Sequence, residues 1–156
     1  MRAGVRIGVD VGSVRVGVAA SDPAGVLATP VTTLRRDVRR GSDLQALAGL
    51  VAEREAVEVL VGLPRTMSGR AGAAVDAARS YAIAVARRVA PVPVRLVDER
   101  LSTVSASRAL RESGVRGQAA RAVVDAAAAV VLLQTGLDEE RSTGRPPGEP
   151  LAGGPV

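Results

Sequence analysis

The order of apolar segments constrains the fold of this chain more than any other feature. Three strand-like runs come first, at 5–11, 15–21 and 25–32, and only short turns separate them. Segments with helical spacing then alternate with two continuous apolar runs, at 57–62 and 92–97. This order predicts an α/β fold with a mixed five-stranded sheet. It combines a three-strand antiparallel meander with parallel strands, and helices cover both faces.

The length of 156 residues indicates one domain. We assign residues 1–137 to this domain. The sequence after Asp138 is rich in glycine and proline and offers too few apolar residues for a core. We therefore expect residues 138–156 to form a disordered tail.

Two missing residue types restrict the chemistry. The chain contains no cysteine and no histidine. This excludes disulfides, thiolate or imidazole metal ligands, and Ser-His or Cys-His dyads. If the protein is an enzyme, its chemistry depends on carboxylates, hydroxyls, arginines and a bound ion or cofactor.

The charge of the chain fits a polyanionic partner. All 21 basic residues are arginine, and the net charge is +5. The planar guanidinium can donate two hydrogen bonds to one phosphate, although coding bias also favours arginine over lysine. Tyr81 is the single aromatic residue, so a row of base-stacking platforms is excluded. If the protein binds nucleic acid, it reads the backbone and the shape.

The sequence gives no sign of a membrane partner. It has no signal-peptide pattern at its start and no apolar run long enough to span a bilayer. We expect a cytoplasmic protein.

Three separated acidic sites lie in apolar surroundings. Asp10 ends an apolar strand, the pair Asp98 and Glu99 follows another, and Asp125 precedes the apolar helical segment 126–133. A buried carboxylate is costly unless its charge is compensated, and a hard divalent cation such as Mg²⁺ or Mn²⁺ compensates several at once. The pattern therefore predicts carboxylates that converge on a metal.

Each acid also has an ordinary structural explanation. Asp10 would cap the following turn, Asp98 or Glu99 would pair with Arg100, and Asp125 would favour a helix N-terminus. Adjacent strand residues point to opposite faces, so at most one of Asp98 and Glu99 faces the site. We expect the remaining acids of residues 1–137 that lie in charged contexts to be solvated: Asp43, Glu53, Glu55, Glu58, Asp76 and Glu112.

Four motifs in order resemble the YqgF/RuvX family. They are Gly8-Val9-Asp10-Val11-Gly12-Ser13-Val14-Arg15-Val16-Gly17-Val18-Ala19, Val61-Gly62-Leu63-Pro64 with Met67 and Gly69, Asp98-Glu99-Arg100-Leu101-Ser102-Thr103, and Val124-Asp125 with Ala128-Ala129. Members are regarded as Holliday-junction resolvases or pre-16S rRNA nucleases with an RNase H-like fold. The resemblance covers residues 5–137.

The resemblance implies a metal-dependent catalytic centre at Asp10, Glu99 and Asp125, with Asp98 as a further metal ligand. We favour Glu99 over Asp98. Arg15 and Arg100 would contact phosphate or balance charge, and a wider set of arginines would bind the nucleic acid: Arg35, Arg36, Arg39, Arg40, Arg65, Arg116 and Arg121. The chain departs from relatives by having Thr66 and Ser68 after Pro64 and few basic residues before Asp125, so its substrate contacts differ.

Three functions remain open at this stage. The first is a nuclease that processes the 5′ end of pre-16S rRNA or resolves four-way DNA junctions, the latter as a symmetric homodimer. The second is a nucleic-acid-binding or ribosome-assembly module without catalysis. The third is an actin-like phosphotransferase, which the single domain and the absence of a lysine-containing phosphate loop disfavour.

Overall fold

The computed structural model describes residues 2–64, 72–99 and 117–151, with the backbone alone for residues 117–125. Along the chain the elements are β1 (Arg6–Val11), β2 (Arg15–Ser21), β3 (Ala28–Arg35), α1 (Ser42–Glu53), β4 (Glu58–Leu63), α2 (Gly72–Val89), β5 (Val94–Asp98), α4 (Gly117–Thr143) and β6 (Glu149–Pro150). None of the helices in this described part has the length and hydropathy to span a bilayer.

The strands form one mixed sheet in the order β3-β2-β1-β4-β5-β6. β1, β2 and β3 are antiparallel neighbours, whereas β1, β4 and β5 run parallel. This confirms the predicted meander followed by parallel strands. The described sheet has six strands rather than five, because the short β6 adds to the edge at β5.

The segment after Asp138 differs from the sequence-based expectation. α4 continues to Thr143, and β6 pairs with β5 in an antiparallel register. The Arg95 side chain donates hydrogen bonds to the carbonyls of Pro147 and Gly148, at 2.7 and 3.1 Å. The expectation of a disordered tail therefore needs correction for residues 138–151, which pack on the domain. Residues 152–156 lie outside the described residues.

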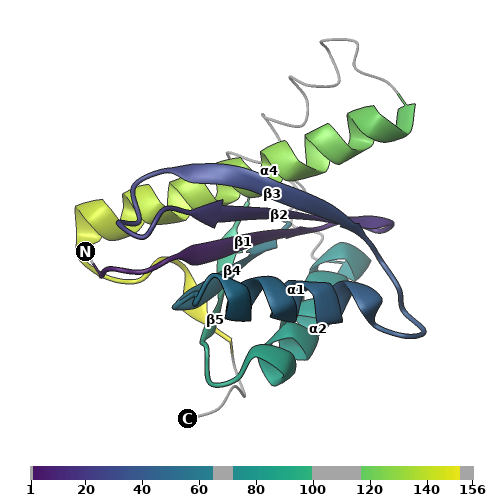
Figure 1. The fold of residues 1–156 in the computed structure, drawn as a ribbon, viewed down its shortest axis with the longest axis horizontal. Helices are drawn as coiled ribbons and strands as arrows, with labels where there is room; N and C mark the ends of the chain where they lie inside the picture. The colour runs from purple at the N-terminus through teal and green to yellow at the C-terminus, as the bar shows by residue number, and fades with distance from the viewer. Residues whose placement is uncertain (1, 65–71, 100–116, 152–156) are drawn as a thin grey trace.

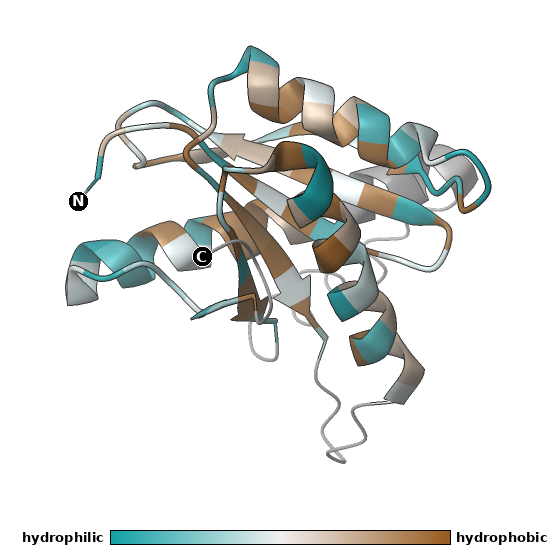
Figure 2. Cartoon of the chain, turned by 90° about the horizontal axis from the view of Figure 1, so that it is seen from below, coloured by the Kyte–Doolittle hydropathy of each residue, from teal (hydrophilic) through white to brown (hydrophobic). Residues whose placement is uncertain are grey.

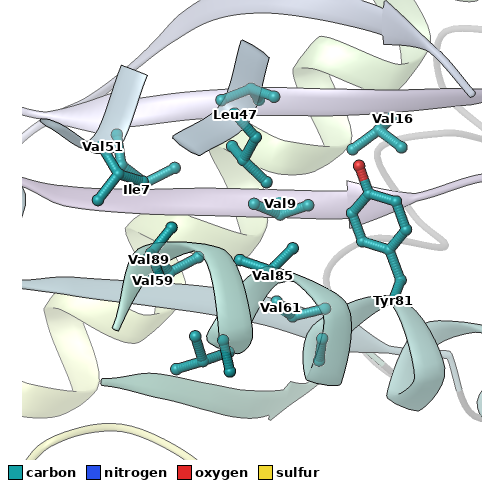
Figure 3. Packing of buried hydrophobic residues seen from close by; sticks show 14 of the residues in the cluster. Ile7, Val9, Val16, Leu47, Val51, Val59, Val61, Tyr81, Val85 and Val89 are labelled. Carbon is teal, nitrogen blue, oxygen red and sulfur yellow. The ribbon is translucent and has the colours of Figure 1, made fainter. Parts of the chain in front are cut away.

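Helices cover both faces of the sheet, as predicted (Figure 1). α1 and α2 lie on one face, and α4 lies on the other, against β1, β2 and β3. The larger core lies beneath α1 and α2, where Ile7 and Val9 of β1 meet Leu47, Val59 and residues of α2 (Figure 3). Figure 2 shows these apolar strand segments between helices with hydrophilic outer turns.

A buried ion-pair network holds α4 at the start of β1. Arg6 is 1% exposed, and its guanidinium donates to Glu140 at 2.9 Å. Arg2 bridges Glu140 at 2.6 Å and Glu58 at 3.1 Å. Buried charges of this kind are tolerated only when they are paired, so the network selects one position of α4 along the sheet.

The same contacts show that α4 runs antiparallel to β1. Glu140 lies at Arg6, whereas a Cβ atom on Gly8 would meet Leu133 Cβ at 2.7 Å and the Ala129 carbonyl at 3.1 Å. Each step along β1 towards its C-terminal end thus corresponds to an earlier position of α4. The absence of a side chain at Gly8 permits this close approach of helix to strand.

Candidate active site

The candidate site lies where β1, β4 and β5 end at one edge of the sheet. Ile7 and Val9 face the core beneath α1 and α2, and Gly8 faces α4. Side chains alternate along a strand, so Asp10 shares the α4 face with Gly8. Asp10 pairs with Gly17 of β2 and is partly buried. This is the edge at which open α/β sheets carry their sites.

Glu99 reaches the same face from the end of β5. Its backbone N–H donates to the Leu63 carbonyl at 3.1 Å, which extends the parallel pairing of β4 and β5 by one residue. Its side chain lies over Gly62, where a Cβ atom would come within 2.5 Å of the Glu99 carboxyl carbon. Glycine at position 62 is therefore what gives the Glu99 carboxylate its place between β1 and β5.

The carboxyl groups of Asp10 and Glu99 interact directly. Glu99 is 6% exposed, and its Oε1 atom is buried without a hydrogen-bond partner among the described residues. Burial, the hydrogen bond with Asp10 and the charges of Asp10 and Asp98 raise the pKa of Glu99 to about 10. Burial also raises the pKa of Asp10, and the hydrogen bond with Glu99 opposes that rise. Two acids this close hold a proton or a cation between them.

Asp98 takes a different position from its neighbour Glu99. It is the exposed last residue of β5, and strand alternation places it on the face of Leu96, opposite to Glu99. Its negative charge nevertheless contributes to the raised pKa of Glu99. Of the two acids that the sequence left as alternatives, Glu99 is the one beside Asp10.

Asp125 lies on α4, in the part for which only the backbone is described. It stands one helical turn before Ala129, which packs beneath Gly8 of β1. One turn of helix advances about as far as two strand residues. The backbone of Asp125 is therefore level with Asp10. Among the described side chains, no group of three acids is assembled for a metal.

The five predicted arginines whose side chains are described fall into two groups. Arg15 begins β2 and is the register partner of Arg35 at the end of β3, close to the turn that follows Asp10. Arg39 and Arg40 are exposed in the next loop. Arg36 is engaged within the protein, because it donates to the Gly12 carbonyl at 3.4 Å and covers the Tyr81 ring at 5.3 Å. Arg65, Arg100 and Arg116 lie outside the described residues, as does the side chain of Arg121.

Two acids that the sequence assigned to solvent are buried instead. Asp43 is 4% exposed and accepts a hydrogen bond from the Tyr81 hydroxyl at 3.0 Å. Glu58 is 1% exposed and pairs with Arg2. The solvated assignment was wrong for both, because their partners are distant in sequence. Local charge patterns carry no signal of such contacts. The role of Gly62 was likewise missed, although its position in a continuous apolar strand was a signal.

Fold and site together define a class of protein. A three-strand meander continued by parallel strands, with an acid on the first strand, is the RNase H-like architecture. The chain is similar to RuvC of Thermus thermophilus, solved with a Holliday junction substrate, with a TM-score of 0.58 and 15% sequence identity. That match covers 95% of this chain and 99% of RuvC, and at this identity it shows the fold alone.

Residues 4–139 match the model of the RuvX family, described as Holliday junction resolvase, and the chain belongs to this nuclease family. A relative from Frankia casuarinae, named "Putative pre-16S rRNA nuclease", is 62% identical and covers 91% of this chain and 70% of its own length. Relatives of the same name from Mycobacterium sp. (strain KMS) and Mycobacterium tuberculosis are each 60% identical. They cover 94% and 87% of this chain and 86% and 79% of their own lengths.

Proposed function

We propose that this protein is a nuclease dependent on Mg²⁺ or Mn²⁺ that hydrolyses phosphodiester bonds of structured nucleic acid. The observation that carries the proposal is the pair formed by the partly buried Asp10 and the buried Glu99, whose Oε1 atom has no hydrogen-bond partner among the described residues. An all-oxygen donor set with an unused, partly shielded oxygen fits a hard divalent cation.

Asp10 and Glu99 would hold the cation, and Asp125 would complete the set from α4. Asp125 stands one helical turn before Ala129, which contacts Gly8 of β1, and this position along α4 supports its inclusion. When bound, such an ion polarises a phosphoryl oxygen and lowers the pKa of the attacking water. Gly62 keeps Glu99 in place, and the protein scaffold fixes the spacing between the carboxylates.

The arginines near this edge would bind the nucleic acid backbone. Arg15 and Arg35 are cross-strand neighbours, and Arg39 and Arg40 extend the positive surface into the following loop. Paired guanidinium groups suit phosphates that lie side by side along a strand. Their position at the end of β2 and β3 nearest the turn after Asp10 would direct the backbone towards the carboxylates.

Precursor 16S rRNA is the substrate we favour. The support is the name shared by relatives of about 60% identity across most of the chain. A four-way DNA junction is the second candidate, favoured by the description of the family and by the RuvC fold. A junction resolvase would act as a homodimer, because two strands must be cut in matched positions.

The test uses labelled precursor 16S rRNA, four-way junction DNA and plain duplex DNA, each with Mg²⁺, Mn²⁺ or EDTA. The wild-type protein is compared with Asp10→Asn and Glu99→Gln, and with Asp76→Asn as the control for an exposed acid. We expect metal-dependent cutting that both site variants lose by at least 100-fold, while the control keeps it.

Three results would reject the proposal in different ways. Tight nucleic-acid binding without cutting, equal in all variants, indicates a binding module. ATP hydrolysis without nucleic acid indicates a phosphotransferase. Cutting that survives in both Asp10→Asn and Glu99→Gln places the active site elsewhere. The preferred substrate decides between rRNA processing and junction resolution.

A further inference from the structure

Arg36 contacts the turn between β1 and β2 at two points. Its main-chain N–H donates to the Val14 carbonyl at 2.8 Å, and its guanidinium donates to the Gly12 carbonyl at 3.4 Å. Gly12 directly follows β1, the strand that carries Asp10. The side chain of Arg36 therefore acts on the end of the turn that lies next to the candidate active site.

The turn is exposed at its tip. Ser13 and Val14 face solvent, and the Gly12 N–H closes the turn by donating to the Arg15 carbonyl at 2.8 Å. A Cβ atom on Gly12 would lie 2.7 Å from that carbonyl oxygen, so the two ends of the turn approach closely. Exposed turns are the parts of a fold that open most easily. A contact from outside the turn therefore limits how far the end of β1 can move.

The Arg36 guanidinium lies on the face of the sheet that α1 and α2 cover. It stands over the Tyr81 ring of α2, with 5.3 Å between the guanidinium carbon and the ring centroid. Figure 3 shows Tyr81 at the end of the core cluster nearest the arrowhead of β1. Asp10 and Glu99 share the face of α4. Arg36 thus reaches the turn from the opposite side and does not occupy the face on which the carboxylates meet.

The Tyr81 ring is a fixed support for Arg36. The ring is buried, and its hydroxyl donates to Asp43 Oδ2 at 3.0 Å. Asp43 lies at the start of α1 and is also buried. A guanidinium over an aromatic ring is attracted by the negative face of the ring. The two helices therefore hold the ring, the ring holds the guanidinium, and the guanidinium holds the turn at Gly12.

Burial restricts what else the Arg36 side chain can bind. Its Nε atom is buried, and its Nη1 atom donates to Gly12. Arginine recognises a phosphate with two neighbouring N–H groups that face the ligand. The edge that contains Nε is closed to solvent and cannot receive a phosphate in this way. Arg35, Arg39 and Arg40 differ from Arg36 because they are exposed.

We propose that Arg36 is a positioning residue, which fixes the end of β1 and thereby the direction of the Asp10 carboxylate, instead of binding nucleic acid as the sequence predicted. Its effect on catalysis rests on the proposed function, whereas its hold on the turn does not. A small displacement of a catalytic group lowers turnover even when the group is present. Loss of the guanidinium should therefore lower kcat and leave the number of phosphate contacts unchanged.

Amide exchange tests the hold on the turn without nucleic acid. The exchange rate of the Gly12 N–H is measured by NMR in EDTA for the full-length wild type, Arg36→Met and Arg36→Lys. Methionine keeps an apolar stem without donors, and lysine keeps the charge on a single ammonium group. We expect exchange at Gly12 to be about 10-fold faster with methionine and about 3-fold faster with lysine. Exchange at Val9, in the middle of β1, should not change.

Tyr81 variants test the support beneath the guanidinium. Tyr81→Leu removes the ring and should speed exchange at Gly12 about as much as Arg36→Met, because both changes break the same contact. The double variant should exchange no faster than the faster single variant. Tyr81→Phe keeps the ring and should change the rate by less than about twofold.

Nucleic-acid binding distinguishes a positioning residue from a phosphate contact. Affinity for precursor 16S rRNA and four-way junction DNA is measured in EDTA at several salt concentrations, and cutting with Mn²⁺ gives kcat and KM. Arg36→Met should lower kcat about 10-fold and keep the salt dependence of the wild type. Arg39→Met removes an exposed arginine and should reduce the slope of log affinity against log salt by about 1.

Three results overturn the proposal: an unchanged Gly12 exchange rate in Arg36→Met, an unchanged kcat despite faster exchange, or a salt slope that falls as far as in Arg39→Met. Arg36→Lys and Tyr81→Leu provide the same comparison if Arg36→Met does not fold. Faster exchange in a protein that cuts none of the substrates supports the hold on the turn and rejects the nuclease function, so the two proposals fail separately.

Discussion

The Glu99 side chain occupies the space that a Cβ atom on Gly62 would require. A Cβ at this position would lie 2.6 Å from Glu99 Cγ and would overlap the carboxylate oxygen. Glu99 is almost fully buried, so it has little room to move away. The site thus depends on a residue without a side chain on β4, which separates the two strands that carry the acids.

Gly62→Ala tests this relationship. We expect it to displace the Glu99 carboxylate and to reduce nuclease activity at least 10-fold, the effect of misplacing a catalytic group by about 1 Å. The folded state should persist with a loss of stability of about 1–3 kcal/mol, because the Glu99 side chain must shift within a closely packed site. Gly49→Ala is the control, because a Cβ at this exposed helical position meets nothing within 4 Å. It should keep full activity and gain about 0.5–1 kcal/mol of stability. Full activity in Gly62→Ala would contradict the role of Glu99.

Glu99→Gln should stabilise the metal-free protein at alkaline pH. The unfolded chain releases the Glu99 proton near pH 4.5, whereas the folded protein retains it to about pH 10. The folded state therefore binds more protons between these values, and its stability falls as pH rises through this window. Glutamine removes this loss. We expect a gain of about 1–3 kcal/mol at pH 8 and little difference below pH 4, measured by urea unfolding in EDTA. A variant that is less stable at pH 8 would contradict the raised pKa.

Divalent cations should stabilise the wild-type protein but not a variant that lacks the Asp10 carboxylate. Mn²⁺ at 100-fold its Kd stabilises the folded state by about 2.7 kcal/mol, and this requires the carboxylates that hold the ion. We expect the wild-type Tm to rise with Mn²⁺ or Mg²⁺ and the Tm of Asp10→Asn to stay constant. Asp76→Asn, at an exposed position on α2, should respond like the wild type. An equal rise in all three proteins would indicate that the ion binds away from Asp10.

The sequence was sufficient for the order and direction of β1 to β5, and the structure brings Asp10 together with Glu99, one of the two acids that follow the last predicted strand. The reason is geometric, since parallel strands align their carboxyl ends and each strand was marked by its apolar run. The sequence could not predict the buried state of Asp43, because its partner Tyr81 is 38 residues away and on another helix. Glycine and proline after Asp138 indicated disorder. The carbonyl groups of that segment instead accept hydrogen bonds from Arg95, which a composition argument does not detect.

The ion pair of Arg6 and Glu140 gives a last prediction, because it lies beyond the domain end expected from the sequence. Arg6 is 1% exposed, and its guanidinium also donates to the Gly4 carbonyl at 2.8 Å. Glu140→Gln would leave this buried cation without its counter-charge, which costs about 3 kcal/mol. Glu139→Gln alters the exposed neighbour and should change stability by less than about 0.5 kcal/mol. Urea unfolding at pH 7 measures both variants.

The pH dependence separates this ion pair from a general packing effect. Burial works against ionisation of Glu140, but the hydrogen bonds and charge of Arg2, with the charge of Arg6, outweigh it and lower the pKa of the carboxyl group. A lowered folded-state pKa contributes stability above the unfolded value, near 4.5, and this contribution is lost as pH falls through the folded-state pKa. The gap between wild type and Glu140→Gln should therefore be full at pH 7 and shrink below pH 4. A gap that stays constant down to pH 3 would show that Glu140 stabilises α4 by packing rather than by charge.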